Sequence, residues 1–315
     1  MSFFKSKNLK NYILICRFDH WFKNIFILPG VIAALAFSND EFNFFQILNS
    51  VILCFISVSL ICSSNYVINE YLDRDFDRFH PTKKKKPAAK GKIKLKYVIT
   101  IYILFIFFGF LFGQNFGEHF KIYLFLLLIM GILYNVKPFR FKEVVFLDVI
   151  IESFNNVLRF LFGWQIILNN TIPPSSLLVL FWTGGAFLMT VKRLAEYRTI
   201  NDKKIAILYR KSFKFYSESK LMLSSFYYAI ITCFFIGIFL IKYRIEFILS
   251  FPFITALFVY YFNIGLKKNS IAQTPENLYK SIKLILIILI IIFTMSFSLL
   301  VDMPILKQLV YPSTY

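Results

Sequence analysis

Apolar residues in this chain gather into long runs separated by polar stretches. The clearest runs cover residues 51–66, 97–113, 221–241, 247–266 and 284–301. Each comes close to the roughly 20 apolar residues that cross a bilayer as a helix. The pattern therefore predicts an all-α fold, a polytopic membrane helical bundle with cytoplasmic cap loops that forms one domain over residues 1–315.

The same pattern predicts about nine transmembrane spans. Their expected ranges are 22–38, 46–68, 96–113, 120–135, 144–167, 177–194, 221–241, 246–265 and 282–301. Composition agrees with this prediction, because 58% of the 315 residues are hydrophobic and only 17% are charged, whereas about a quarter of an ordinary soluble domain is charged. The lipid bilayer is thus the first partner that the sequence implies.

A formal net charge of +19 is also found in proteins that bind nucleic acid, but the distribution of the charge here indicates membrane topology instead. Most lysines and arginines fall in the N-terminal segment and in every second loop, including the long loops around residues 69–95 and 195–220. Excess Lys and Arg marks the cytoplasmic side. We therefore expect a multi-pass protein of the inner (cytoplasmic) membrane with its N-terminus inside and its C-terminus outside, and no nucleic-acid partner.

A stripe of polar side chains follows the second predicted span. If that helix continues beyond its apolar part, Asn69, Asp73, Asp77 and His80 fall at offsets of 0, 4, 8 and 11 residues, which places them on one face. Pro81 then ends the helix. Such a stripe at the end of a membrane helix is a candidate ligand site.

Glu70 lies on nearly the same face as Asp73 and Asp77, and carboxylates at these spacings repel one another. A divalent cation would remove the repulsion. Ligands that are all oxygen, with no thiolate, favour Mg²⁺, which typically binds one or two carboxylates together with substrate phosphates. The simpler interpretation is a solvated helix end in which Arg74 and Arg78 neutralise the acids.

Three further groups of charged or polar residues lie near the expected cytoplasmic ends of the helices. A run of lysines that includes Lys83 and Lys86 follows the stripe; it forms either a positively charged cytoplasmic loop or, beside the stripe, a binding site for phosphate oxygens. Lys192, Arg193 and Glu196 end the sixth span; they form either a salt-bridged helix end or a second phosphate clamp facing the first. Tyr134 and Lys137, at the inner end of the fourth span, could contribute to the same mouth.

A further polar stripe lies within the fifth span. Asp148, Glu152, Asn155 and Arg159 are at offsets of 0, 4, 7 and 11 residues. Ionisable groups at membrane depth are costly and usually line a cavity, so this stripe favours a functional role over a purely structural one.

These motifs together resemble the UbiA superfamily of intramembrane prenyltransferases, which have nine transmembrane helices. The family's first motif, NDxxDxxxD, reads here Asn69–Glu70–x–x–Asp73–x–x–x–Asp77, with Glu in the place of the second-position Asp.

One branch, decaprenyl-phosphate phosphoribosyltransferase, is more closely similar. That branch continues as DRxHPxKxxRP, and this chain has DRFHPTKKKKP from Asp77 to Pro87, with Lys86 in the Arg position. The place of a second acidic motif holds Lys192, Arg193 and Glu196, similar to the branch's GKRxAE. Two shorter matches complete the likeness. Arg17 with Trp21, Lys23 and Asn24 resembles the branch's N-terminal RxxxWxKN, and Leu158–Arg159 with Gly163 resembles its Leu-Arg pair in the fifth helix.

The resemblance implies transfer of a 5-phosphoribosyl group from phosphoribosyl diphosphate to a polyprenyl phosphate, with Mg²⁺ as the cofactor and release of pyrophosphate. The metal ligands it implies are Asn69, Glu70, Asp73 and Asp77. The expected catalytic residues are Asp73, Asp77, Lys192, Arg193 and Glu196. The expected substrate-binding residues are Lys23, Asn24, Arg78, His80, Lys83, Lys86, Tyr134, Lys137 and Arg159.

Two other functions remain open at this point. The same metal site could ionise a prenyl diphosphate and transfer its prenyl group to an aromatic or other small acceptor. A transporter without enzymatic activity is the third possibility. Two features of the sequence argue against it: the charges gather at one membrane face, and no paired broken helices are evident at mid-depth.

Overall fold

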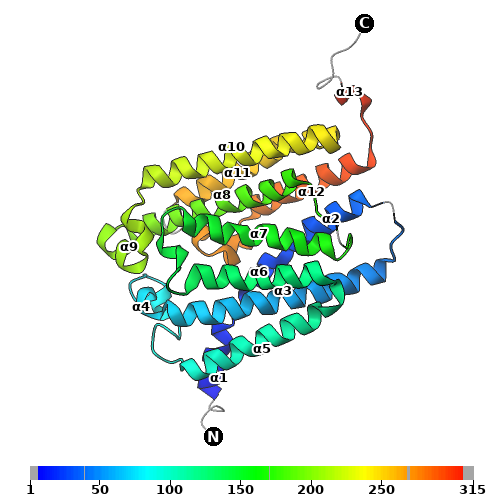
Figure 1. The fold of residues 1–315 in the computed structure, drawn as a ribbon. Coiled ribbons are helices and arrows are strands. Elements are labelled where there is room, and N and C mark those ends of the chain that lie inside the picture. The colour runs from blue at the N-terminus through cyan, green and yellow to red at the C-terminus, as the bar shows by residue number, and fades with distance from the viewer. Residues whose placement is uncertain (1–5, 39, 170, 268–269, 308–315) are drawn as a thin grey trace. The chain divides into compact units, whose positions relative to one another are not determined.

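The structure is a computed structural model that describes residues 6–307 except 39, 170, 268 and 269, and every regular element in this part of the chain is a helix (Figure 1). The long helices are α2 (Ile27–Phe37), α3 (Phe44–Leu72), α5 (Leu95–Gly113), α6 (Glu118–Asn135), α7 (Leu147–Gln165), α8 (Ser175–Ile200), α10 (Glu218–Tyr243), α11 (Phe251–Leu266) and α12 (Ile282–Leu300). Each overlaps one of the nine predicted spans.

Short helices connect these long ones. They are α1 (Ser6–Ile15), η1 (Phe18–Phe26), α4 (Arg74–Asp77), η2 (Lys83–Lys85), η3 (Gln114–Phe116), η4 (Phe141–Glu143), α9 (Lys203–Tyr209), η5 (Lys211–Lys214), η6 (Ile245–Ser250), η7 (Ile271–Gln273), η8 (Pro275–Lys280) and α13 (Pro304–Lys307). The first predicted span is thus the pair η1 and α2. It begins after Arg17, whose backbone has a φ of 53°.

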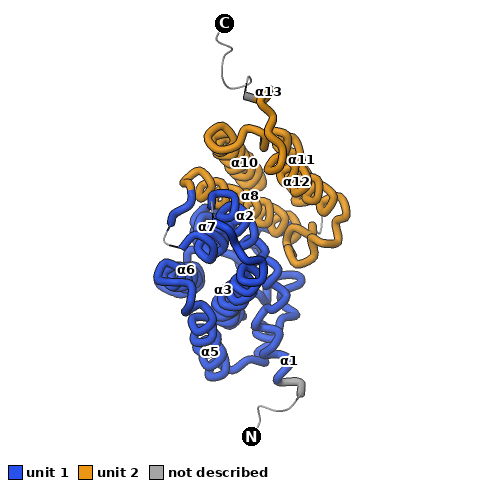
Figure 2. Tube along the Cα trace, turned by 90° about the vertical axis from the view of Figure 1, so that its right-hand side faces the viewer, with its two compact units in different colours: residues 1–173, 200–216 blue, residues 174–199, 217–315 orange. Residues whose placement is uncertain are grey.

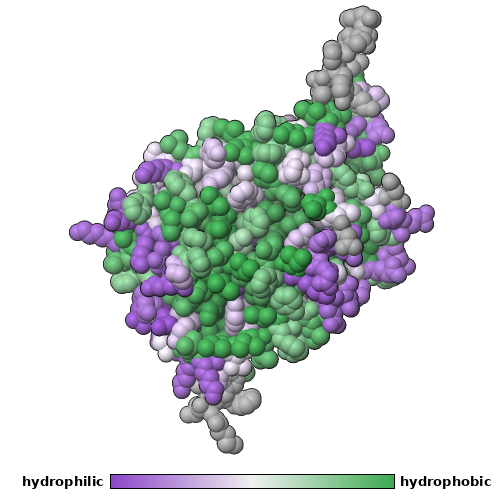
Figure 3. Space-filling model, in the orientation of Figure 1, coloured by the Kyte–Doolittle hydropathy of each residue, from purple (hydrophilic) through white to green (hydrophobic). Residues whose placement is uncertain are grey.

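Eight helical segments of the described chain are long and apolar enough to cross a membrane. Helix α7 falls outside that set, because Asp148, Glu152 and Arg159 interrupt its apolar sequence. Large apolar side chains such as Phe45, Phe107 and Phe226 are mostly exposed on the helices, as expected of surfaces that face lipid rather than water. Figure 3 shows hydrophobic residues over the middle of the helices and polar residues toward their ends. The prediction of a multi-pass helical membrane protein is confirmed.

The chain folds into two compact units (Figure 2). Unit 1 contains residues 1–173 and 200–216, and unit 2 contains residues 174–199 and 217–315. The segment 200–216, between α8 and α10, therefore belongs to unit 1 although both flanking helices belong to unit 2. The sequence predicts a single domain, and that prediction remains open.

Unit 1 is built around α3, the longest helix. Small and polar residues allow its neighbours to approach closely: Ser57 Oγ donates to the backbone oxygen of Gly109 on α5 at 2.7 Å, and Asn65 Nδ2 donates to that of Leu127 on α6 at 2.9 Å. Hydrogen bonds of this kind between helices replace the hydrophobic driving force that lipid removes.

Helices α2 and α7 of unit 1 pack through glycine. A Cβ atom at Gly30 would lie 2.1 Å from the backbone oxygen of Phe160, and one at Gly163 would lie 2.0 Å from that of Ile27. No side chain fits at either position without separating the helices. This close approach places the N-terminal segment against the polar middle of α7.

Unit 2 packs α8, α10, α11 and α12 around an apolar cluster that includes Phe187, Val191, Tyr261 and Ile264. A buried hydrogen bond of 2.9 Å between Thr232 and Thr183 links α10 to α8.

Candidate active site

The carboxylates predicted to bind metal lie where α3 gives way to α4. The two helices are interrupted only at Asp73, whose amide still donates to the Asn69 oxygen at 2.9 Å, while the Asp77 amide donates to the Asp73 oxygen at 2.8 Å. The helical hydrogen-bond pattern therefore continues from residue 69 to 77, and the stripe keeps one face. Beyond Asp77 the chain turns away, so the single helix expected as far as Pro81 ends earlier.

Glu70 and Asp77 share one lysine. Lys86 Nζ lies 2.7 Å from Glu70 Oε1 and 2.9 Å from Asp77 Oδ2, and Arg17 donates to the same Glu70 oxygen at 2.9 Å. Both carboxylates are only 4% exposed. Lys86 is thus held by two carboxylates. The sequence predicts that this lysine binds phosphate, and it does not predict these two partners.

Asp73 is held by cations from the loop between α6 and α7. Arg140 and Lys142 both contact Asp73 Oδ1, at 2.8 Å and 2.5 Å. Lys142 Nζ also donates to the side-chain oxygens of Asn69 at 2.9 Å and Asn135 at 2.8 Å. A buried ammonium therefore lies among three oxygen ligands.

The neutralising cations differ from those considered in the simpler sequence interpretation. Arg74 and Arg78 pair instead with Asp75, which is exposed, and Arg78 also donates to the backbone oxygen of Ala89. Arg78 therefore contacts none of the three carboxylates, and its expected substrate-binding role stays a prediction. Arg140 and Lys142 could have been anticipated only from their place in a basic loop beside Tyr134.

The carboxylates retain capacity for a metal ion. Each cation contact uses one oxygen, so that Glu70 Oε2, Asp73 Oδ2 and Asp77 Oδ1 accept no hydrogen bond from any described residue. These three side chains do not converge within 4.8 Å of one another in the described chain. The donor set thus fits Mg²⁺ held by one or two carboxylates and completed by phosphate oxygens.

The pKa values of the site reflect burial beside opposing charges. Burial raises the pKa of Asp73, but the charges of Lys142 and Arg140 outweigh it and hold that pKa below its usual value. Burial lowers the pKa of Lys142 to about 8 despite its contact with Asp73. Burial raises the pKa of Asp77, with a smaller contribution from the nearby carboxylates. Further positive charge near Asp77 would therefore stabilise the ionised form of its carboxylate.

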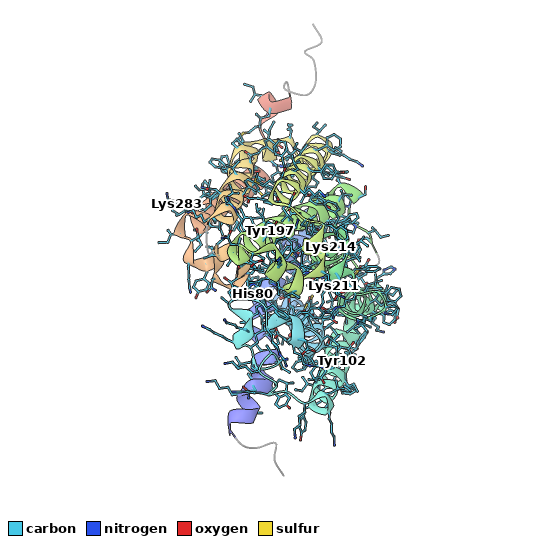
Figure 4. The ribbon with its side chains drawn as sticks, turned by 90° about the vertical axis from the view of Figure 1, so that its left-hand side faces the viewer. His80, Tyr102, Tyr197, Lys211, Lys214 and Lys283 are labelled. Atoms are coloured by element: carbon cyan, nitrogen blue, oxygen red, sulfur yellow. The ribbon has the colours of Figure 1, made fainter. Side chains whose placement is uncertain are left out.

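The segment 200–216 packs against these loops within unit 1, and Figure 4 labels Lys211 of this segment near His80. The Tyr209 ring lies 4.6 Å from the ring of His80, and the Tyr209 hydroxyl contacts Lys83. His80 Nδ1 accepts from the amides of Thr82 and Lys83 at 3.3 Å. These contacts give His80 a structural role in shaping the lysine-rich turn.

The same segment is fixed to the start of α7. The Tyr216 hydroxyl donates to Asp148 Oδ1 at 2.6 Å and accepts from the amide of Phe146 at 2.8 Å. Arg210 donates to the backbone oxygen of Lys142 at 3.2 Å and, at 3.4 Å, to the hydroxyl of Tyr134. Tyr134 is therefore in contact with Arg210, and its expected place at the mouth of the site stays a prediction. Lys137 is exposed and makes no polar side-chain contact within the described chain.

The N-terminal motif lies along α3 below the carboxylates. Trp21 Nε1 donates to Ser63 Oγ and Asn24 Nδ2 to Ser59 Oγ, both at 2.8 Å. The ammonium of Lys23 lies 5.8 Å from the centre of the Tyr66 ring. The residues of the motif therefore contact successive turns along the polar face of α3.

Arg159 joins this motif to α7, because its Nε donates to Asn24 Oδ1 at 2.9 Å. Lys192, Arg193 and Glu196 lie on α8 in unit 2, where Arg193 and Glu196 form a buried ion pair of 2.9 Å. The expected position of this second cluster opposite the carboxylates remains a prediction.

The fold and the buried charged cluster define a multi-pass helical membrane protein with a candidate ligand site at the end of α3. The sequence profile of the UbiA prenyltransferase family matches residues 26–287. The chain belongs to the UbiA prenyltransferase family.

Solved structures support the fold. A UbiA homolog from Archaeoglobus fulgidus, solved with GPP and Mg²⁺, superposes with a TM-score of 0.68 over 92% of this chain and 100% of that one, at 22% identity. A structure described as digeranylgeranylglyceryl phosphate synthase gives a TM-score of 0.61 over 93% and 99%, at 18% identity.

Curated relatives are more distant in sequence. Decaprenyl-phosphate phosphoribosyltransferase from Mycobacterium tuberculosis is 25% identical over 64% of this chain and 64% of its own length, and that from Mycolicibacterium smegmatis is 28% identical over 68% and 65%. Protoheme IX farnesyltransferase from Alkalihalophilus pseudofirmus is 24% identical over 62% of each. The chain thus spans slightly less than two thirds of the length of the curated relatives it matches.

Proposed function

We propose that this chain transfers a 5-phosphoribosyl group from phosphoribosyl diphosphate to a polyprenyl phosphate in the inner membrane, releasing pyrophosphate with the help of Mg²⁺. The observation that carries the proposal is the enclosure of the carboxylates Glu70, Asp73 and Asp77 by buried or partly buried cations from three separate segments. Such a site can bind a metal–diphosphate and still offer positive charge to another phosphate.

Mg²⁺ would be held by Asp73 and Asp77, with Asn69 and Glu70 as further oxygen donors, and when bound it would stabilise the negative charge of the departing pyrophosphate. The chain's own residues complete this work. Lys86 and Lys142 lie directly beside the carboxylates, where they would also stabilise the negative charge of the pyrophosphate. Buried cations of fixed position stabilise developing charge without having to reorganise.

The surplus of cations favours a phosphoribosyl donor over a prenyl donor. Phosphoribosyl diphosphate carries a separate 5-phosphate in addition to its diphosphate, whereas a prenyl diphosphate is otherwise apolar. Lys83, Arg210 and Lys211 lie in the same unit beyond the carboxylates and can meet this further charge. The similarity to two decaprenyl-phosphate phosphoribosyltransferases supports the same choice.

The acceptor requires no general base, because a lipid phosphate is already an anion at neutral pH. Its phosphate oxygen would attack the anomeric carbon from the face opposite the diphosphate, with Arg159 or Lys23 orienting it. The apolar helix surfaces of unit 1 suit its prenyl chain.

Prenyl transfer is the second candidate. It is supported by the similarity to protoheme IX farnesyltransferase and by the fold shared with homologs bound to GPP or DMAPP. It requires an acceptor that is not a lipid phosphate, and this difference makes the two functions separable. A transporter has no specific observation in its favour.

A transfer assay tests the proposal. The purified full-length protein is incubated with Mg²⁺, labelled phosphoribosyl diphosphate and a polyprenyl phosphate, and the lipid is then extracted into organic solvent. We expect label in the lipid phase, and a decrease on the order of 100-fold or more in Asp73→Asn. Asp75→Asn is the matched control, because Asp75 is 61% exposed and, among the described residues, pairs only with Arg74 and Arg78.

The opposite result is equally clear. Absence of phosphoribosyl transfer, together with prenyl transfer from geranyl diphosphate to an aromatic acid, would replace this function by the second candidate.

A further inference from the structure

Arg159 is a buried cation surrounded by neutral groups. It lies on α7 of unit 1 and is 6% exposed. Its Nε donates to Asn24 Oδ1 at 2.9 Å, one terminal nitrogen donates to Asn156 Oδ1 at 3.0 Å, and the other lies 3.9 Å from Cys62 Sγ. Two amides and a thiol thus position the guanidinium without neutralising it.

Within the described residues, no carboxylate oxygen lies within 4.0 Å of this guanidinium. Glu152, on the same helix, is two turns away and makes no ion pair with it. The other buried cations of unit 1 differ: Arg140 and Lys142 each contact Asp73 directly. Arg159 therefore stands apart as a buried cation that no carboxylate of the described residues contacts directly.

An uncompensated charge at membrane depth is costly, and such residues usually mark a ligand path or ligand site. The desolvation penalty is offset only by an opposite charge with good geometry. Asn155, one turn earlier on the same helix, has a buried side-chain oxygen that accepts no hydrogen bond. An anionic ligand would satisfy Arg159, and a protonated phosphate oxygen or a water molecule bound to it would donate to the oxygen of Asn155.

We infer that Arg159 binds the phosphate of the lipid acceptor, a phosphate monoester on a prenyl chain. This inference rests on the proposed function, because it names the residue that holds the acceptor in that reaction. Asn24 and Asn156 aim the guanidinium, and their neutral amides keep its charge available to the ligand.

The depth of Arg159 suits this role. It contacts Cys62, eight residues before Glu70 on α3, which corresponds to about 12 Å along a helix axis. This separation leaves room for the diphosphate and the sugar between the carboxylates and the acceptor phosphate. The prenyl chain can meanwhile remain in the apolar part of the bilayer.

Asn24→Asp provides the sharpest test, because it changes one amide into a carboxylate at hydrogen-bond distance from Arg159. The new carboxylate would form an internal ion pair and compete with the ligand. Ser59, which now accepts from Asn24, can donate its hydroxyl proton instead. We expect Asn24→Asp to melt at a higher temperature without ligand and to bind a lipid phosphate at least tenfold more weakly.

The binding experiment uses labelled farnesyl phosphate and the full-length protein in nanodiscs, without Mg²⁺ or donor, with farnesol as the uncharged comparison. We expect the wild type to prefer farnesyl phosphate at least tenfold. Arg159→Gln should lose this preference, and Arg159→Lys should retain part of it. Lys121→Gln is the control for the loss of one positive charge, since Lys121 pairs on the surface with Glu118.

Competition identifies the source of the phosphate. Displacement of farnesyl phosphate by ribose 5-phosphate, dependent on Arg159, would assign the guanidinium to the donor and overturn the inference; displacement by inorganic phosphate alone would do the same. Binding unchanged in Arg159→Gln or in Asn24→Asp would also overturn it. If Arg159→Gln fails to fold, Asn24→Asp still decides the question.

The proposed function can fail separately. Arg159-dependent binding of farnesyl phosphate without any phosphoribosyl transfer would retain this inference and reject that function. Conversely, phosphoribosyl transfer that persists at the wild-type KM for the acceptor in Arg159→Gln would retain the function and reject the inference.

Discussion

Glu70 binds two cations through a single oxygen. Its Oε1 accepts from Arg17 and from Lys86, so one buried carboxylate joins the N-terminal segment to the lysine-rich turn. The family motif has Asp at this position. The longer Glu side chain extends further from the helix, which suits a residue that reaches two long side chains from different segments.

Replacing Glu70 by Gln should therefore destabilise unit 1. The change would leave Arg17 and Lys86 without this carboxylate, and we expect a loss on the order of 2 kcal/mol, less than for a fully buried pair because both cations are partly exposed. Thermal unfolding in a constant detergent measures it. Glu118→Gln is the control, since its surface pair with Lys121 should contribute no more than about 1 kcal/mol. Equal melting of the two variants would show that Glu70 has no such role.

The individual residues also show what the sequence could and could not predict. Spacing alone placed Asn69, Asp73 and Asp77 on one face, and the helical hydrogen bonds keep them there. The contacts of Arg140 and Lys142 with Asp73 could not be predicted, because they join positions almost 70 residues apart and no local period encodes such pairs. Lys137, in the same basic loop, was the expected cation and is the exposed one.

At the scale of the helices, the close packing of α2 and α7 controls the geometry around Arg159. Gly30 and Gly163 each face a backbone oxygen of the partner helix, at 2.1 Å and 2.0 Å from the position a Cβ would take. Asn24 ends the segment that leads into α2, so its distance from Arg159 depends on this contact.

Gly163→Ala should push the two helices apart. Overpacking of this kind typically costs about 1–3 kcal/mol, and the shift should also weaken binding of farnesyl phosphate. Gly237→Ala is the matched control on α10, because nothing lies within 4 Å of its Cβ position; there the better helix propensity of Ala should leave stability unchanged or raise it by up to about 1 kcal/mol. Paired melting curves of the two variants measure the difference. A Gly163→Ala protein as stable as the control would contradict the packing argument.

At the scale of the whole molecule, hydrophobic runs were sufficient to predict nine helices close to their observed bounds, since a bilayer imposes a length on each apolar segment. They could not predict the division into two units or the membership of residues 200–216 in unit 1. That membership depends on particular side chains, such as Tyr216 bonded to Asp148, rather than on hydropathy.

The orientation in the membrane is open to a direct test. Because the basic residues cluster in alternate loops, we expect the N-terminus inside and the C-terminus outside. Alkaline phosphatase fused at the C-terminus should be active and green fluorescent protein should be dark there, whereas fusions ending within residues 200–216 should behave in the opposite way. The reversed pattern would place the carboxylates on the outer face.

The return of residues 200–216 to unit 1 also constrains how the protein is made. When the ribosome has completed α7, the buried Asp148 still lacks the Tyr216 hydroxyl, which is synthesised only after the whole of α8. The first five long helices of the nascent chain, from α2 to α7, therefore leave the translocon with an unfinished polar interior. A gene fragment that ends at residue 173 would encode most of the site and still omit the segment that closes it.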